Sequence, residues 1–162
     1  MKLTTLGHAA ALIELQSGAR LLLDPWLEDP AYFHTWWHFP PLKLRIKDLG
    51  RIDGIYLSHD HPDHCDPKTL VQIPRDTEIF LADFESESTD RIVRELGFSK
   101  VRRMPFRQPF TWQGASIECL RTDLPWDDSS LIVKDGDETL FDMNDCKLSD
   151  STLDQLGQKY QF

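Results

Sequence analysis

The residues best suited to chemistry lie in one short stretch, from His59 to His64, which reads His-Asp-His-Pro-Asp-His. Three imidazoles and a carboxylate there form a mixed nitrogen and oxygen donor set, which suits Zn²⁺ and also Fe²⁺ or Mn²⁺. In an extended segment His59 and His61 point the same way and can reach one ion. Asp63 and His64 follow a proline bend and can face a second. The spacing therefore predicts a site for one or two metal ions.

Such a site predicts hydrolytic chemistry, in which a metal-bound hydroxide attacks an ester, lactone, amide or phosphodiester. The metal lowers the pKa of its water toward about 7 and polarises the electrophile. We expect Asp63 to hold the second metal and to orient the hydroxide. Asp60 alternates away from the ligands, so we expect it to hydrogen bond to an imidazole N–H. The alternative, solvated loop histidines, is disfavoured by three histidines directly after an apolar strand.

The elements that must position this stretch can be inferred from the flanking residues. The apolar run 55–57 predicts a buried strand that leads into the loop. Asp66 followed by Pro67 predicts a helix directly after it, because this pair suits a helix N-terminus. Periodicity predicts further strands at 2–6, 7–15, 19–23, 78–82, 100–104, 115–121, 130–134 and 139–143, and helices at 88–96 and 149–156.

A second unusual segment, residues 26–41, combines many aromatic rings with prolines that argue against a long helix. Its rings cover the core, line a pocket mouth or form an interaction surface, and the sequence leaves these three alternatives open. The rings are Trp26, Tyr32, Phe33, Trp36, Trp37 and Phe39. His8, after a glycine near the start of a strand, either approaches the metal loop or is hydrogen bonded at a turn.

Composition limits the class of protein. The chain has 162 residues, which fits a single domain over 1–162. Its net charge of -9 disfavours a nucleic-acid partner, and no apolar run reaches the roughly 18 residues of a membrane span, so we expect no membrane partner. The three cysteines, without CxxC spacing, indicate no disulfide framework and fit a cytoplasmic setting. No signal peptide is visible. The expected partner is a small-molecule substrate.

Several motifs resemble those of the metallo-β-lactamase fold superfamily. They are the His59–His64 run, Leu6-Gly7-His8-Ala9-Ala10 and Leu22-Leu23-Asp24-Pro25-Trp26-Leu27. Within that superfamily the chain is similar to the CMP-N-acetylneuraminate hydroxylase-like branch, through Asp24-Pro25-Trp26-Leu27, Trp36-Trp37 with Pro40-Pro41, Ile55-Tyr56-Leu57-Ser58-His59 and Asn144-Asp145-Cys146. The resemblance implies an α/β (α+β) αββα sandwich, with metals at the sheet edges between its two halves.

The resemblance also implies ligands beyond the loop. Asp145 matches the aspartate that bridges the two metals, and its place at a strand end supports this independently, although an Asx turn is the alternative. All six histidines lie at or before position 64, so the later histidine ligands are absent. Asp123 is the best carboxylate replacement for one of them, with Asp128 next. More oxygen in the shell would favour Fe or Mn over Zn²⁺.

Three functions stay open at this point. The first is a metal-dependent hydrolase. The second is an iron-dependent oxygenase of the same fold, although the Rieske segment of the hydroxylases, which needs paired Cys-x-His ligands, has no counterpart here. The third is a non-catalytic metal-binding domain, since we expect the chain to be an incomplete or shortened version of the fold. A second copy, in a homo-oligomer, or a completing partner chain would then supply the rest.

Overall fold

The computed structural model describes residues 1–162, which form two sheets and three α-helices. The first sheet has the strand order β1-β2-β3-β4-β5-β6, and the second has the order β10-β9-β8-β7. The strands of the first sheet are β1 (Lys2–Gly7), β2 (Ala10–Glu14), β3 (Arg20–Leu23), β4 (Gly54–Leu57), β5 (Glu78–Ala82) and β6 (Val101–Met104). Those of the second are β7 (Phe110–Trp112), β8 (Ala115–Arg121), β9 (Ser129–Asp135) and β10 (Glu138–Asp142).

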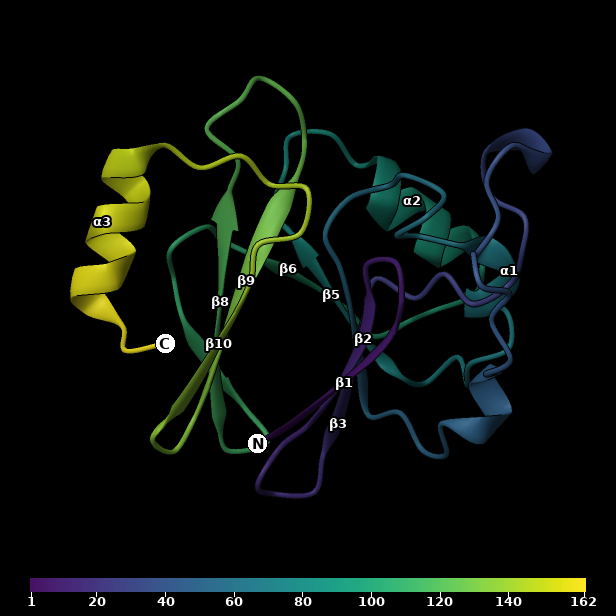
Figure 1. Ribbon diagram of the computed structural model, residues 1–162, viewed down its shortest axis with the longest axis horizontal. Helices are drawn as coiled ribbons and strands as arrows, with labels where there is room; N and C mark the ends of the chain where they lie inside the picture. The colour runs from purple at the N-terminus through teal and green to yellow at the C-terminus, as the bar shows by residue number, and fades with distance from the viewer.

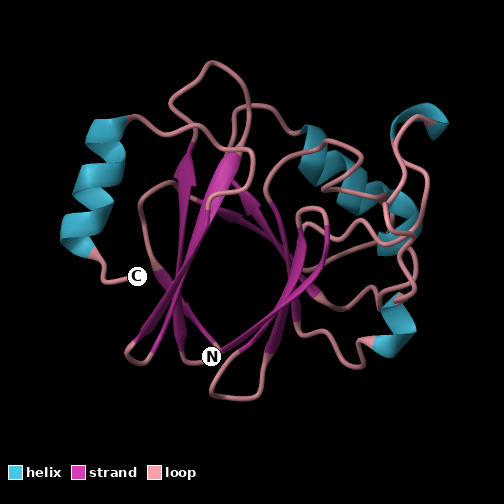
Figure 2. Ribbon diagram, in the orientation of Figure 1, coloured by secondary structure: helices cyan, strands magenta, loops and turns pink.

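The two sheets face each other and the helices lie outside them, which confirms the predicted αββα sandwich (Figures 1 and 2). The helices α1 (Pro67–Leu70) and α2 (Ser88–Glu95) cover the six-stranded sheet, and α3 (Asp150–Lys159) covers the four-stranded sheet. One apolar core lies between the sheets, and a smaller one lies between α3 and the second sheet. A third fills the space under α1 and α2.

Strand direction explains why polar residues meet at one end of the sandwich. β3, β4 and β5 run parallel, with Leu23 opposite Tyr56, so the residues that follow β3 and β4 leave the sheet at the same edge. The second sheet meets this edge through Ser129 at the start of β9. Its hydroxyl accepts a hydrogen bond of 2.8 Å from Tyr56 and donates one of 2.8 Å to the carbonyl of Ser58. The loops of both sheets are thus held together here.

The loop after β4 is fixed at its far end by helix α1, whose predicted start is confirmed. Asp66 caps the helix, because its carboxylate accepts hydrogen bonds from the backbone N–H groups of Lys68 and Thr69. The hydroxyl of Thr69 donates to Asp66 at 2.7 Å and accepts from the backbone of Leu27 at 2.9 Å. The cap therefore also holds the beginning of the aromatic segment.

Some local features escape sequence patterns. Strand β7, three residues long, was not predicted, and the expected strand 7–15 is divided by a turn before Ala10. The first residue of β4, Gly54, lies against the rings of Phe80 and Trp112. A side chain does not fit there, because a Cβ atom would lie 2.8 Å from ring atoms of both. Two 3-10 turns, η1 (Tyr32–His34) and η2 (Ile46–Asp48), lie in the long connection between β3 and β4. No helix has the length and apolar character needed to cross a membrane.

The aromatic segment divides between the core and the surface. Trp26 is completely buried and stacks on the buried His38, with ring centroids 4.0 Å apart. Phe33 and Phe39 are 99% and 96% exposed, and Trp37 is 62% exposed. Core cover therefore describes only the beginning of this segment.

Candidate metal centre

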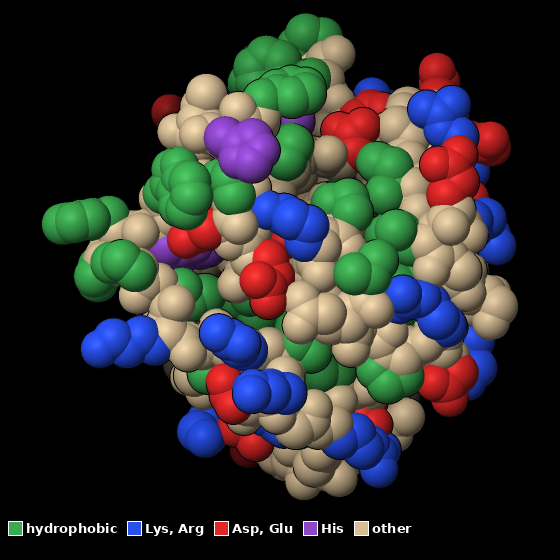
Figure 3. Space-filling view, turned by 90° about the vertical axis from the view of Figure 1, so that its right-hand side faces the viewer, with side chains coloured by type: hydrophobic (Ala, Val, Ile, Leu, Met, Phe, Trp, Pro, Cys, Tyr) green, Lys and Arg blue, Asp and Glu red, His purple; other side chains and the backbone are tan.

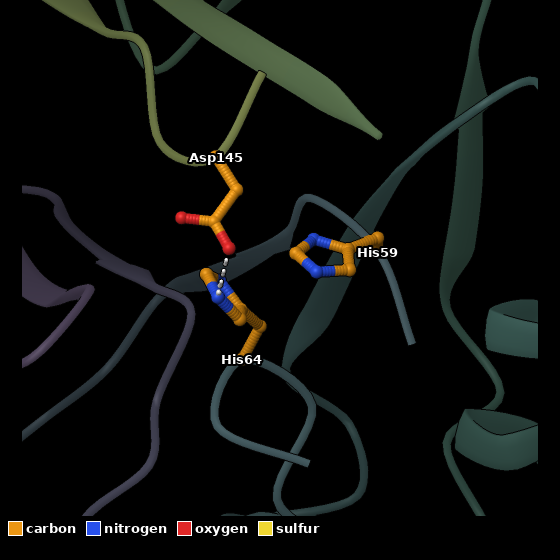
Figure 4. Close-up of side chains that lie close together, drawn as sticks. All are labelled: His59, His64 and Asp145. Carbon is orange, nitrogen blue, oxygen red and sulfur yellow. Dashed lines mark ion pairs between the residues drawn. The ribbon is translucent and has the colours of Figure 1, made fainter. Parts of the chain in front are cut away.

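Three potential ligands meet where the loops after β4 and β10 approach each other. One ligand atom from each of His59, His64 and Asp145 lies within 4.8 Å of the others (Figure 4). His59 and His64 are buried, whereas the Asp145 side chain is 64% exposed. The structure thus brings together donors from the two sheets, at the edge where the resemblance places the metals.

The imidazole of His64 is held by a carboxylate at one ring nitrogen and faces two further carboxylates at the other. Its Nδ1 lies 3.0 Å from the Asp24 carboxylate, and its Nε2 lies 3.5 Å from an oxygen of Asp63 and 3.5 Å from an oxygen of Asp145. A carboxylate on one ring nitrogen and free donors around the other is the usual arrangement of a metal-binding histidine. His64 is therefore oriented to offer Nε2 as a ligand.

Asp24, which sequence reasoning did not assign to the site, is the hub of this arrangement. It is fully buried and accepts hydrogen bonds of 2.8 Å from both the backbone N–H and the hydroxyl of Ser58. The side-chain amide of Asn144 donates to it as well. Asp24 follows β3, and it lies next to the end of β4 only because these two strands pair. The sequence shows the first fact but not the second. Asp60, which we expected to hydrogen bond to an imidazole N–H, is exposed, and the imidazoles of His59 and His64 contact Ser58 and Asp24 instead.

His59 is oriented in a similar way by the second sheet. Its Nδ1 lies 2.9 Å from the hydroxyl of Ser58 and 3.3 Å from the carboxylate of Asp128, which is buried directly before β9. The ring of His61, which is exposed, lies 4.4 Å from that of His59 between centroids. The predicted pair of histidines is therefore adjacent, although His61 lies outside the tightest group.

The two candidate carboxylates of the second sheet occupy different places. Asp123 accepts hydrogen bonds from the backbone of Ser149 at 2.7 Å and from the hydroxyl of Thr152 at 3.1 Å, so it fixes the start of α3. It is not part of the group formed by His59, His64 and Asp145. Asp128, the second choice from the sequence, is the carboxylate that contacts a loop histidine. The structure thus favours Asp128 over Asp123.

The charges of the site are strongly coupled. Burial alone would raise the pKa of Asp63, but its contact with His64 and a hydrogen bond from Tyr32 outweigh burial and hold the pKa well below its usual range. Burial would lower the pKa of His64, yet the carboxylates of Asp24 and Asp63 raise it to about 10. In the metal-free protein, the site thus holds a positive charge between carboxylates.

The 3-10 turn η1 and the turn after β1 also reach the site. Tyr32 donates a hydrogen bond of 2.7 Å to Asp63, and burial together with that bond raises its pKa, so the phenol keeps its proton. His8 Nδ1 lies 3.8 Å from Asp63, and its ring packs edge-on against Trp26. His8 therefore approaches the metal loop, the first of its two alternatives.

Cysteine contributes nothing to the donor set. Cys65, Cys119 and Cys146 are buried and free, which confirms that no disulfide framework exists. Burial raises the pKa of Cys146 to about 11 and that of Cys119 to about 12, so both stay thiols near neutral pH. The donors are thus imidazoles and carboxylates, a set that fits Zn²⁺, Fe or Mn.

Two hollows flank the candidate centre. One, of about 490 Å³, has mostly apolar walls that include Leu3, Trp36 and Phe141. The other, of about 850 Å³, is a polar groove that includes Trp126, Asp127 and Lys147. Asn144 and Asp145 line both, so a small molecule in either hollow would lie beside the centre.

The fold and this donor set define a class of protein. A sequence-family model, described as the beta-lactamase superfamily domain, matches residues 2–145 of the chain. The chain belongs to the metallo-β-lactamase superfamily, and both the predicted fold and the predicted family are confirmed.

Relatives in sequence include the branch that the motifs resemble. The chain is 36% identical to a Mycobacterium tuberculosis protein named for a Rieske 2Fe-2S iron–sulfur centre, over 99% of this chain and 32% of the relative. It is 37% identical to the cytidine monophosphate-N-acetylneuraminic acid hydroxylase of Mus musculus, over 52% of this chain and 15% of that protein. The chain thus spans at most about a third of the length of these relatives.

Solved structures with the same fold differ in chemistry. An isothiocyanate hydrolase from Delia radicum gut bacteria superimposes with a TM-score of 0.78 at 22% identity, over 98% of this chain and 67% of that one. CmlA, a diiron β-hydroxylase from Streptomyces venezuelae, superimposes with a TM-score of 0.76 at 22% identity, over 96% of this chain and 32% of that one. The likeness establishes the fold, which these two proteins use for hydrolysis and for hydroxylation.

Proposed function

We propose that the chain is a metal-dependent hydrolase domain with a centre of one or two ions. The observation that carries the proposal is the orientation of His59 and His64, each held at Nδ1 by oxygen acceptors. Buried imidazoles without a metal-binding role need no such common direction, whereas ligands do. The relation of this fold to a hydrolase supports the same choice.

The ligands can be assigned by position. His59 and His61 would hold one ion, His64 and Asp63 would hold a second, and Asp145 would lie between them. Asp128 would supply oxygen beside His59, where the resemblance leads us to expect a histidine. When bound, the metal acidifies a water molecule and polarises the electrophile. Zn²⁺ fits the imidazoles, and the carboxylates also admit Fe or Mn.

The chain's own groups would orient and hold the substrate. Asp63 is ionised, and Tyr32 fixes one of its oxygens, so the other can accept a proton or a ligand bond. The ester, lactone, amide or phosphodiester group would lie by Asp145, because this residue lines both hollows. The rest of a small molecule would extend along one of them.

An iron-dependent oxygenase is the second candidate. The carboxylate Asp128 beside His59 favours it, since oxygen-rich donor sets suit iron. The relation to a cytidine monophosphate-N-acetylneuraminic acid hydroxylase and the fold shared with a diiron β-hydroxylase point the same way. The two candidates use the same residues and differ in the metal and in the need for oxygen and electrons.

Metal content and hydrolysis test the proposal together. Protein purified without chelator is analysed by mass spectrometry for each element, then assayed with 4-nitrophenyl acetate and bis(4-nitrophenyl) phosphate. We expect bound metal and hydrolysis that a chelator removes and Zn²⁺, Fe²⁺ or Mn²⁺ restores. His59→Ala should lose both, whereas His34→Ala, which alters an exposed histidine outside the centre, should keep both.

The outcomes separate the candidates. Hydrolysis that survives complete removal of metal, or metal content unchanged in His59→Ala, would contradict the assignment. Iron with no hydrolysis, combined with oxygen consumption in the presence of a reductant, would support the oxygenase. Protein that binds no metal at all would leave a non-catalytic domain.

A further inference from the structure

Three aromatic side chains project from the protein in and after η1, at residues 33–39. Phe33 and Phe39 are almost completely exposed, and Trp37 is 62% exposed. We call these three side chains the aromatic tip. In Figure 1 the segment that includes η1 stands out from the body at the upper right, beyond α1 and α2. The tip is therefore a convex apolar feature in contact with water.

The backbone beneath the aromatic tip is anchored. His38 is buried, and its Nδ1 lies 2.7 Å from the carboxylate of Asp29. Lys68 donates hydrogen bonds to the carbonyl oxygens of Glu28 and Pro30. These contacts hold the backbone at the base of the tip, so the aromatic side chains project from a fixed position.

The segment that follows the aromatic tip in the sequence is rich in basic side chains, in contrast with the acidic chain as a whole. Residues 31–50 contain three basic side chains, Lys43, Arg45 and Lys47, and a single acidic one, Asp48. The three basic side chains are exposed and form no ion pair. This segment thus carries +2 within a chain of net charge -9. Figure 3 shows hydrophobic side chains projecting at the left edge of this face, with Lys and Arg side chains next to them.

We propose that the aromatic tip docks the protein on an anionic lipid surface. Aromatic side chains bind at the boundary between lipid head groups and acyl chains, and nearby Lys and Arg are attracted to anionic head groups. A convex tip suits a deformable lipid layer. The acidic remainder of the chain would face away from the membrane, which fixes the orientation. The sequence-based expectation of no membrane partner rested on the lack of a membrane-spanning run, which does not bear on docking through a local surface.

Vesicle binding tests the proposal directly. The purified chain is sedimented with phosphatidylcholine vesicles, with and without phosphatidylglycerol, at low and high salt. We expect binding that requires phosphatidylglycerol and weakens as salt rises. Phe33→Ser/Trp37→Ser/Phe39→Ser should lower the partition coefficient by at least about tenfold, because it removes the inserted apolar area. Lys43→Gln/Lys47→Gln should lower it by roughly tenfold, on anionic vesicles only.

A matched control keeps the test specific. Trp126, 52% exposed, lies in the loop before β9 and outside the tip, so Trp126→Ser should bind vesicles like the parent protein. The fluorescence of the parent should shift to the blue on binding, and Trp37→Phe should reduce that shift. Circular dichroism checks that every variant is folded.

Two results would overturn the proposal. The first is a lack of binding to anionic vesicles at low salt, or binding that the triple aromatic variant retains. The second is concentration-dependent self-association that the triple variant abolishes while vesicles bind neither protein, because the tip would then be an interface between copies of the chain. Neither result depends on metal content, so the test is independent of the proposed hydrolase.

Discussion

The two loops that form the candidate centre are organised very differently. The loop after β4 is buried, and His59 and His64 are each held by side chains of the interior. The loop after β10 offers Asp145, whose side chain is 64% exposed and lies 3.5 Å from His64 Nε2. In the first loop the fold fixes the positions of both histidines. In the second loop the candidate ligand Asp145 faces solvent.

This difference indicates how the fold divides its tasks. Asp24 and Ser58 link the loop after β4 to the interior of the six-stranded sheet, so a change there alters both the site and the stability of the protein. Asp145 can change with little effect on the core. We therefore expect substitutions in the two loops to separate stability from metal affinity.

The largest effect should come from Asp24→Asn. This change replaces a buried acceptor of several hydrogen bonds with an amide, so one N–H group faces donors such as those of Ser58 and Asn144. We expect the free energy of unfolding of the metal-free protein to fall by about 3 kcal/mol. Metal affinity should fall by about tenfold to a hundredfold, because His64 loses its orienting partner. Urea denaturation and chelator competition measure the two.

Asp60→Asn is the control for this experiment, since Asp60 is an exposed carboxylate of the same loop. We expect it to change unfolding by less than about 0.5 kcal/mol. Equal losses in the two variants would remove the special status given to Asp24.

A more selective effect, confined to metal binding, is expected for Asp145→Ala. The exposed carboxylate contributes little to folding, so the urea midpoint of the metal-free protein should stay unchanged. If Asp145 is a metal ligand, as proposed, its removal should nevertheless weaken metal binding by about a hundredfold. A large loss of stability without loss of metal would reverse the proposed division between the two loops.

The smallest effect is expected for Asp123→Ala, which tests the choice between the two carboxylates of the second sheet. The substitution removes hydrogen bonds to Ser149 and Thr152, so α3 should be destabilised by about 1 kcal/mol with metal affinity unchanged. Asp128→Ala should instead lower metal affinity, measured by the same chelator competition. If Asp123→Ala were the variant that lost metal, the sequence-based order of the two would be right after all.

Sequence patterns were informative where the determinants are local. The run from Ile55 into the histidines predicts a strand followed by a ligand loop, and Asp66-Pro67 predicts the start of α1, because each depends on neighbouring residues. The resemblance extended this to the sandwich and to Asp145. The approach of His59 and His64 follows from the compact loop that these elements enclose.

Other features depend on contacts between distant parts of the chain. Asp24 reaches His64 because β3 and β4 are parallel neighbours, and 40 residues separate the two side chains in the sequence. Alternation along an extended segment suggested that Asp60 would serve an imidazole, but the chain turns after His61 and leaves Asp60 in solvent. Asp123 binds the start of α3, and the local sequence around position 123 does not encode this contact.

The protonated His64, which lies between Asp24 and Asp63, affects the order in which the protein folds and binds metal. A protonated imidazole offsets one of the two carboxylate charges while no ion is bound, so we expect the chain to fold without its metal. We expect folding and metal loading to be separate steps, unlike in zinc fingers, which are unfolded without their ion. Loading becomes an exchange of a proton for a metal ion, and a chelator should empty the site while the two sheets remain intact.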